Sequence, residues 1–307
     1  IGEYNKALLD YNKAIELDPD DMNNLFNRSV IYENLEEYEK AISDLLRIIE
    51  VDKDGSYRKE SGDVYNNLAV YYDRLQNPDK SLEYLSEEIN LNPDSYLAHR
   101  NRAKIYAYNL NDNEKALIDF NKAIELDSTI VSNFFDRAIF YNEIGEYNKA
   151  LLDYNKAIEL DPDDMNNLFK RSLTYENLEE YAKAISDLLR IIEMDKDGSY
   201  VKNEQYVLRN LGYYYMYLEN YDNALQYYTE EINLNPDDYL VYRNRANLYA
   251  YDLNDNEKAL IDYNKAIELD SIEDNFYYRG EFFKEIGEYN KALLDYNKAI
   301  ELDPDDM

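Results

Sequence analysis

The segment IGEYNKALLDYNKAIELDPDDM occupies residues 1–22 and returns unchanged at residues 144–165 and 286–307. Its apolar residues recur at the three- and four-residue spacing that is typical of one face of an amphipathic helix: Tyr4, Ala7, Leu8, Tyr11, Ala14 and Ile15. Pro19 disfavours helical backbone in the residue before it. We therefore expect a helix over about residues 3–17, followed by a turn whose aspartates cap the next helix.

The same periodicity continues along the chain as pairs of helices joined by short turns. One such hairpin contains too little apolar surface to be stable alone, so neighbouring hairpins must stack on it. Both ends of the chain fall within copies of one segment. We therefore expect the chain to be part of a longer tandem array.

The composition restricts the kinds of partner. Asp and Glu number 65 against 33 Lys and Arg, which gives a net charge of −32. Such a surface repels nucleic acids and anionic membranes and attracts basic partners. No apolar run is long enough to cross a bilayer, so no membrane insertion is expected.

Catalytic signatures are not found in the sequence. The chain has no Cys and one His, and it contains neither a Walker loop nor a GxGxxG motif. His99 occupies a packing position of the repeat, which favours a structural role. We expect no enzymatic activity, no catalytic residue and no cofactor.

Residues 131–164 carry the most regular copy of the repeat. Large residues stand at positions 4 and 11, small residues at positions 8, 20 and 27, and proline at position 32: Phe134, Tyr141, Ala138, Ala150, Ala157 and Pro162. This spacing resembles the tetratricopeptide repeat family. The resemblance implies an all-α fold, in which antiparallel helix hairpins stack into a right-handed superhelical solenoid.

We interpret residues 1–307 as a single continuous solenoid with a half repeat at 1–21. The full repeats are expected at 22–55, 62–95, 96–130, 131–164, 165–198, 205–238, 239–272 and 273–306. Six residues are inserted at 56–61 and at 199–204, and one extra residue is expected in the inter-helix turns near 109–113 and 252–256. These matched irregularities indicate duplication of a four-repeat unit.

Position 20 is alanine in most repeats, which predicts a close approach of helices there. The second repeat of each half departs from the pattern. Ser81 replaces the alanine at position 20, and Glu88 and Glu231 stand at position 27, where the family has a small residue. We interpret these departures as local packing adjustments.

The family resemblance implies that a partner would bind the concave surface, at positions 2, 5, 9, 12 and 13 of each first helix. Aromatic residues beside arginine, which are favoured at binding hot spots, occur there. The alternative is that tyrosine, with 35 copies, is abundant throughout the chain and many of the copies fill packing positions. The candidate partner-binding residues are Tyr206, Arg209, Tyr213, Tyr217, Arg243, Asn247, Tyr251, Arg100, Lys104 and Tyr108. Arg100 and Lys104 resemble part of the clamp that holds a terminal carboxylate in chaperone-binding members, but Phe26 and Val30 stand where its other groups would be, so the clamp is not predicted.

Residues 193–204 partly resemble a calcium loop, with acids at offsets 1, 3, 5 and 12 and glycine at offset 6. The candidate ligands are Glu193, Asp195, Asp197 and Glu204. The alternative is an inter-repeat turn that uses Asp and Gly for its geometry. We favour the turn and predict no metal site.

Two functions follow from this interpretation. The first is a scaffold that mediates protein–protein interaction by binding a protein or peptide on its concave surface. The alternative is a self-assembling fibre in which further copies of the chain stack end to end. The duplicated segments favour the fibre, whereas the differing residues of the concave positions favour the scaffold, which we prefer.

Overall fold

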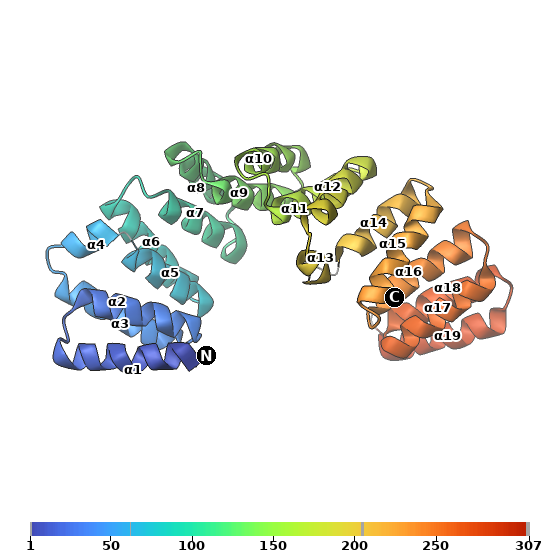
Figure 1. Cartoon of the computed structure of the whole chain (residues 1–307), viewed down its shortest axis with the longest axis horizontal. Coiled ribbons are helices and arrows are strands. Elements are labelled where there is room, and N and C mark those ends of the chain that lie inside the picture. The colour runs from blue at the N-terminus through green and yellow to red at the C-terminus, as the bar shows by residue number, and fades with distance from the viewer. Residues whose placement is uncertain (1, 62, 204–205, 305–307) are drawn as a thin grey trace. The chain divides into compact units, whose positions relative to one another are not determined.

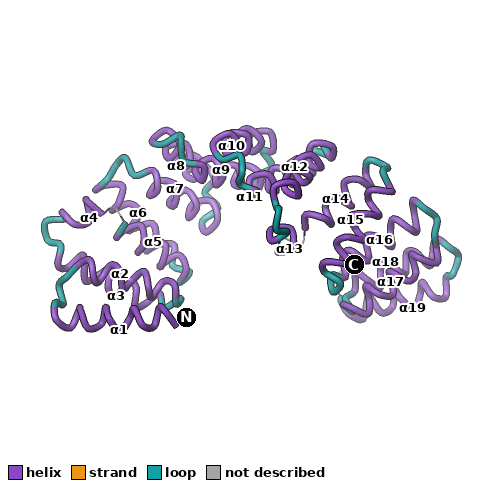
Figure 2. The backbone as a smooth tube through the Cα atoms, in the orientation of Figure 1, coloured by secondary structure: helices purple, strands orange, loops and turns teal. Residues whose placement is uncertain are grey.

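The computed structural model describes residues 2–61, 63–203 and 206–304, and throughout these parts it consists of helices joined by short loops (Figures 1 and 2). The chain divides into two compact units, Ile1–Pro162 and Asp163–Met307. Each unit is a stack of antiparallel helix hairpins. The all-α, solenoid class of fold that the sequence predicts is confirmed.

The first unit begins with a single helix and continues with four hairpins. Its helices are α1 (Gly2–Leu17), α2 (Met22–Asn34), α3 (Tyr38–Val51), α4 (Ser56–Ser61), α5 (Val64–Arg74), α6 (Pro78–Leu91), α7 (Tyr96–Lys104), η1 (Ile105–Asn109), α8 (Asn113–Leu126), α9 (Val131–Glu143) and α10 (Tyr147–Leu160). Helix α2 pairs with α3, α5 with α6, α7 with α8 and α9 with α10, and each hairpin contacts the next.

The second unit contains four hairpins of the same kind. Its helices are α11 (Met165–Asn177), α12 (Tyr181–Met194), α13 (Ser199–Asn203), α14 (Tyr206–Tyr217), α15 (Tyr221–Leu234), α16 (Tyr239–Asn247), η2 (Leu248–Asp252), α17 (Asn256–Leu269), α18 (Glu273–Glu285) and α19 (Tyr289–Leu302). Figure 1 shows α14 to α19 as successive pairs. No helix in the described parts of the chain is both long and apolar enough to cross a membrane.

The close approach of helices expected at position 20 agrees with the structure, where this position is buried in every hairpin and is alanine in all but the second, which has Ser81. The alanines there have at most 2 % of their surface exposed: Ala41, Ala116, Ala150, Ala184, Ala224, Ala259 and Ala292. Ala157, at position 27, is completely buried. A methyl group is all that these helix crossings accommodate, since a larger side chain would overpack the contact.

The inserted residues take helical structure. The six-residue insertions contain the short helices α4 and α13. The carboxylate of Asp52 accepts hydrogen bonds from the backbone N–H groups of Tyr57 and Arg58, at 3.2 and 3.0 Å, and Asp195 bonds Tyr200 and Val201 in the same way. These bonds satisfy N–H groups that a helix start leaves without partners, which explains why each insertion forms a helical turn.

The single extra residue of the third repeat lies elsewhere than the sequence suggests. We expected it in the inter-helix turn, but the last turn of the first helix becomes a π-helix in both units, as η1 and η2. A π turn holds one residue more than an α turn. The insertion is thereby absorbed within the helix, in the π turns that also hold the exposed Tyr108 and Tyr251.

Candidate functional site

The first helices of the last three hairpins in the second unit line a hollow of about 410 Å³. We call it the tyrosine groove. Helices α14, α16 and α18, together with η2, contribute its lining residues: Met216, Asn247, Tyr251, Asp252, Tyr277, Tyr278, Glu281 and Glu285. It therefore combines aromatic rings with carboxylates on one face of successive repeats.

Two tyrosine rings of the groove are open to solvent. Tyr251 is 47 % exposed and Tyr277 is 49 % exposed. Large aromatic side chains supply much of the binding energy at protein interfaces. The groove therefore presents the side chains that interface hot spots favour.

The polar groups of the groove are acidic and only partly neutralised. Glu281 pairs with Lys284 at 2.5 Å and also accepts a hydrogen bond from the Tyr296 hydroxyl. Burial raises the pKa of Tyr251, and the nearby charges of Glu281 and Glu285 raise it further. Three carboxylates, of Asp252, Glu281 and Glu285, thus face the groove against the single cation of Lys284.

The arginines predicted to bind a partner are already paired within the protein. Arg243 forms an ion pair with Asp274 at 3.1 Å, and its guanidinium lies 4.6 Å from the centre of the Tyr278 ring. Arg209 pairs with Asp238 at 3.0 Å and lies 4.7 Å from the Tyr206 ring centre. These arginines connect neighbouring hairpins and leave little positive charge for a ligand.

The remaining candidates of the second unit occupy two places. Asn247 lies in the groove and accepts a hydrogen bond from the Tyr263 hydroxyl at 2.5 Å. Tyr213 donates to the hydroxyl of Tyr217 at 3.1 Å, and the Tyr217 ring stacks on Tyr181 at 4.8 Å. These rings form a cluster between α12 and α14 and do not line the groove.

The candidates of the first unit also bond to their own neighbours. Arg100 and Lys104 both approach Asp136, at 3.4 and 3.8 Å, and Arg100 donates to the Ser132 hydroxyl. Burial raises the pKa of the Tyr108 hydroxyl, as do the charges of nearby carboxylates. Arg100 and Lys104 thus pair with a neighbouring hairpin of the protein.

Two of the calcium-loop candidates, Asp195 and Asp197, accept backbone hydrogen bonds, and Glu193 is an exposed residue of α12. Asp195 caps α13, and Asp197 accepts a hydrogen bond from the backbone N–H of Ser199 at 3.0 Å. Glu204 lies outside the described residues. Among the described residues, no group of three or more His, Asp or Glu side chains is arranged to hold a metal ion.

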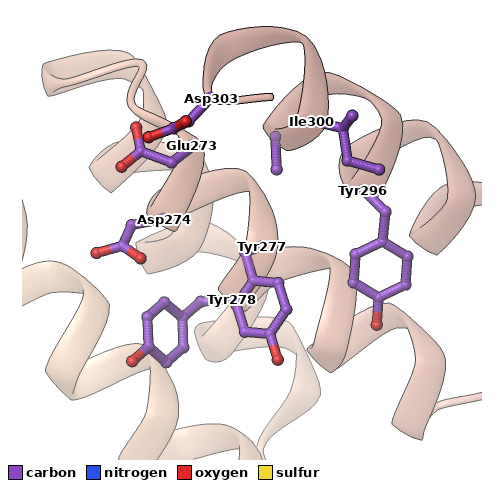
Figure 3. A pocket seen from close by; sticks show the side chains of 8 residues that line it. Glu273, Asp274, Tyr277, Tyr278, Tyr296, Ile300 and Asp303 are labelled. Carbon is purple, nitrogen blue, oxygen red and sulfur yellow. The ribbon is translucent and has the colours of Figure 1, made fainter. Parts of the chain in front are cut away.

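Another hollow, of about 350 Å³, lies between α18 and α19 (Figure 3). Figure 3 shows the rings of Tyr277 and Tyr296 at its border, with Glu273, Asp274 and Asp303 at one edge. In the preceding hairpin the counterpart of Tyr296 is Tyr263, which is 1 % exposed and packs 5.3 Å from Phe282 on α18. The α18–α19 groove is therefore the face on which a further first helix would pack.

Of the eight residues that line the tyrosine groove, the sequence-based candidates include Asn247 and Tyr251 but none on α18. Tyr277, Glu281 and Glu285 occupy positions 5, 9 and 13 of the last repeat. The positions that identified Asn247 and Tyr251 in the preceding repeat would have identified these three as well. The sequence pattern was therefore sufficient, but the same positions had to be examined in the last repeat as well.

Stacked hairpins with an aromatic groove across their first helices define a helical-repeat protein. Models of the tetratricopeptide repeat match residues 10–43, 66–129, 166–197, 205–238, 241–272 and 275–306, and a model described as TPR repeat matches residues 140–179. The chain belongs to the tetratricopeptide repeat family. Its repeats support a role as a scaffold for protein–protein interaction.

Solved structures share the fold at low sequence identity. A tetratricopeptide repeat protein from Parabacteroides merdae is 23% identical, with a TM-score of 0.61 over 80% of this chain and 95% of its own. PilF from Pseudomonas aeruginosa is 18% identical, with a TM-score of 0.57 over 70% of this chain and 95% of its own. YrrB, described as a TPR protein with an unusual peptide-binding site, is 23% identical, with a TM-score of 0.52 over 62% of this chain and 94% of its own. No curated protein matches the sequence.

Proposed function

We propose that the chain is a non-enzymatic scaffold that binds a protein or peptide segment on the concave surface formed by the first helices of its hairpins, with the tyrosine groove as the main site. The observation that carries this proposal is the pair of exposed rings, Tyr251 and Tyr277, beside a hollow of about 410 Å³. That volume is in the range of pockets that hold ligands. YrrB, with its described peptide-binding site, is a precedent on a similar fold.

Selection of random displayed peptides on the immobilised protein tests this function without assuming a partner. We expect enriched peptides whose binding is lost in the Tyr251→Ala variant. Ile261→Ala is the matched control, since Ile261 is a 60 % exposed apolar residue on the second helix of the same hairpin. Peptides that bind the parent and Tyr251→Ala equally well would exclude the groove as the site.

A second candidate function is end-to-end stacking of copies, and the α18–α19 groove favours it. Helix α19 has the same sequence as the corresponding part of α1, and α2 packs against α1 in the first unit. A helix like α2 therefore suits the face of α19 on which Ile300 lies. Self-association that disappears in Ile300→Glu, but persists when the 70 % exposed Leu294 is changed to Glu, would support this function in light-scattering measurements. A monomer at all concentrations would exclude it.

A further inference from the structure

We propose that the tyrosine groove recognises a lysine or arginine side chain of its bound segment, an inference that rests on the scaffold function proposed above. Three features point to this chemistry: the charges that face the groove, the arrangement of cations on other rings of the same unit, and the pairing of the nearby arginines, which leaves little positive charge for an acidic ligand.

The groove contains more acidic than basic charge. Asp252, Glu281 and Glu285 line it, and Lys284 is the nearby cation that pairs with Glu281. Neither Asp252 nor Glu285 forms an ion pair with any residue that the structure describes. Asp252 also accepts a hydrogen bond from the Tyr221 hydroxyl, and Lys284 lies near Glu285 as well as Glu281. Three carboxylates against one lysine still leave net negative charge for a cation from outside, in a chain whose net charge is −32.

The protein's own packing shows how its aromatic rings hold cations. The ring of Tyr175 lies between Arg171 and Lys183, with the charged groups 5.8 and 5.4 Å from its centre. The Tyr249 ring has the same arrangement with Arg245 and Lys258, at 6.0 and 5.2 Å. Such cation–π contacts are attractive because the ring face is electron-rich.

The two exposed rings of the groove lack this contact. Within the described part of the chain, no Lys or Arg lies over the ring of Tyr251 or Tyr277. Both rings border the carboxylates of the groove. A basic side chain that enters the hollow would pack its aliphatic stem and its charge against a ring face. Its N–H groups would donate hydrogen bonds to a carboxylate.

An acidic partner segment fits this face poorly. Its natural counter-charges would be Arg209 and Arg243, and both already pair with aspartates of adjacent hairpins, Asp238 and Asp274. A bound carboxylate would have to displace those pairs and also approach Glu281 and Glu285. Like charges brought together at an interface oppose binding, so the groove selects for basic segments.

The test uses the full chain and three labelled synthetic peptides of one length, in which leucine alternates with lysine, with norleucine or with glutamate. Norleucine keeps the apolar stem of lysine and removes its charge. We expect the lysine peptide to bind about tenfold more tightly than the norleucine peptide, the ratio expected of a partly desolvated cation–π contact. The glutamate peptide should not bind, and added salt should weaken the lysine peptide.

Matched variants separate the groove from the overall charge. Asp252→Asn with Glu285→Gln removes two exposed acids of the groove, whereas Glu230→Gln with Glu257→Gln removes two exposed acids from second helices. We expect about tenfold weaker binding of the lysine peptide for the first pair and unchanged binding for the second. Tyr277→Phe should retain binding and Tyr277→Leu should reduce it, because only the ring is needed.

Each contrary result has a distinct meaning. Equal losses in the two double variants would show diffuse attraction to the acidic surface and would overturn the inference. Tight binding of the glutamate peptide, or equal binding of the lysine and norleucine peptides, would overturn it as well. A peptide from the display selection that requires Tyr251 would still support the scaffold function in those cases.

Discussion

At the scale of single residues, one arrangement of side chains recurs through most hairpins. An arginine at position 7 of the first helix forms a bidentate pair with an aspartate on the second helix. The pairs are Arg28–Asp44, Arg102–Asp119, Arg137–Asp153, Arg171–Asp187, Arg245–Asp262 and Arg279–Asp295. In the second hairpin of each unit both partners are replaced together, by Leu68 with Tyr84 and by Leu211 with Tyr227. The tyrosines then stack on Tyr72 and Tyr215, at 5.5 and 5.6 Å between ring centres.

This joint replacement predicts how the pair responds to mutation. Asp153→Ala should lower the free energy of unfolding by about 3 kcal/mol, because it leaves the buried charge of Arg137 without a partner. The double variant Arg137→Leu with Asp153→Tyr copies the Leu–Tyr combination of the second hairpin of each unit. It should recover most of that loss. Urea unfolding of the three proteins gives the measurement. A double variant less stable than Asp153→Ala would contradict the interpretation.

The buried glutamates of the same two hairpins have a different effect. Glu88 and Glu231 have at most 1 % of their surface exposed. Each accepts one hydrogen bond, from Asn92 and Asn235 at 2.8 Å, while the other carboxylate oxygen has no partner among the described residues. Burial raises the pKa of both carboxyls, against the opposing effect of the asparagine bonds.

Because the pKa of these buried glutamates is raised in the folded state, the stability of the protein should depend on pH. As the pH rises above about 4.3, the usual pKa of glutamate, the unfolded chain loses its proton first and the folded protein becomes relatively less stable. Glu231→Gln should therefore increase the melting temperature more at neutral pH than at pH near 4. The exposed Glu230→Gln is the control, for which no such trend is expected; equal shifts at both pH values would argue against a buried charge.

At the scale of helices and turns, one residue in the inter-helix turn of every repeat adopts a left-handed backbone, at position 15, or at position 16 in the two repeats with an extra residue. It is glycine in two hairpins, Gly145 and Gly287, but Glu36, Gln76, Asn111, Glu179, Glu219 and Asn254 in the others, with φ between 53 and 58° for these. A residue with a side chain is strained in this region. The hairpins therefore differ in the strain of their turns although their geometry is alike.

Opposite substitutions at this one position should have opposite effects. Glu179→Gly removes the backbone strain of the folded state but makes the unfolded chain more flexible. The net effect should be a stabilisation of up to about 1 kcal/mol. Gly145→Val should cost about 1–2 kcal/mol, because a β-branched residue is disfavoured there. Both changes can be measured by urea unfolding, and effects of the same sign would contradict this explanation.

The helices and the place of the six-residue insertions were predictable from the sequence, but the place of the single extra residues was not. Periodicity located α1 and the buried face of Ala150 and Ala157, because these depend on spacing within one element. An extra residue can either lengthen the inter-helix turn or widen the helix into a π turn. The local spacing of apolar residues does not distinguish these two outcomes. Arg209 and Arg243 were correctly placed on the first helices, but their pairing with Asp238 and Asp274 depends on contacts between hairpins.

At the scale of the whole molecule, the charge imbalance affects stability as well as partner choice. Acidic residues outnumber basic residues 65 to 33, and many of the basic side chains form local pairs such as Lys13–Glu16 and Lys265–Glu268. The remaining acids repel one another across a compact surface. Folding brings these charges closer together and is opposed by their repulsion.

Salt should consequently stabilise the protein. Between low and physiological ionic strength the Debye length falls to about 8 Å, which screens the repulsion among exposed acids more than it weakens the buried arginine–aspartate pairs. We expect the melting temperature to rise with sodium chloride in calorimetric scans. A fall in melting temperature would mean that the exposed ion pairs contribute more than the repulsion costs.

The π turn of the third hairpin has a consequence for how this protein tolerates changes in length. Loss of one codon inside an ordinary helix rotates all following residues by about 100° around the axis and misaligns the packed face. Loss of one codon within Leu248–Asp252 would instead convert η2 into an α turn, so the hairpin would keep its packing while Tyr251 and Asp252 would shift. At this place in the gene, a deletion could change what the protein binds and leave its ability to fold unharmed.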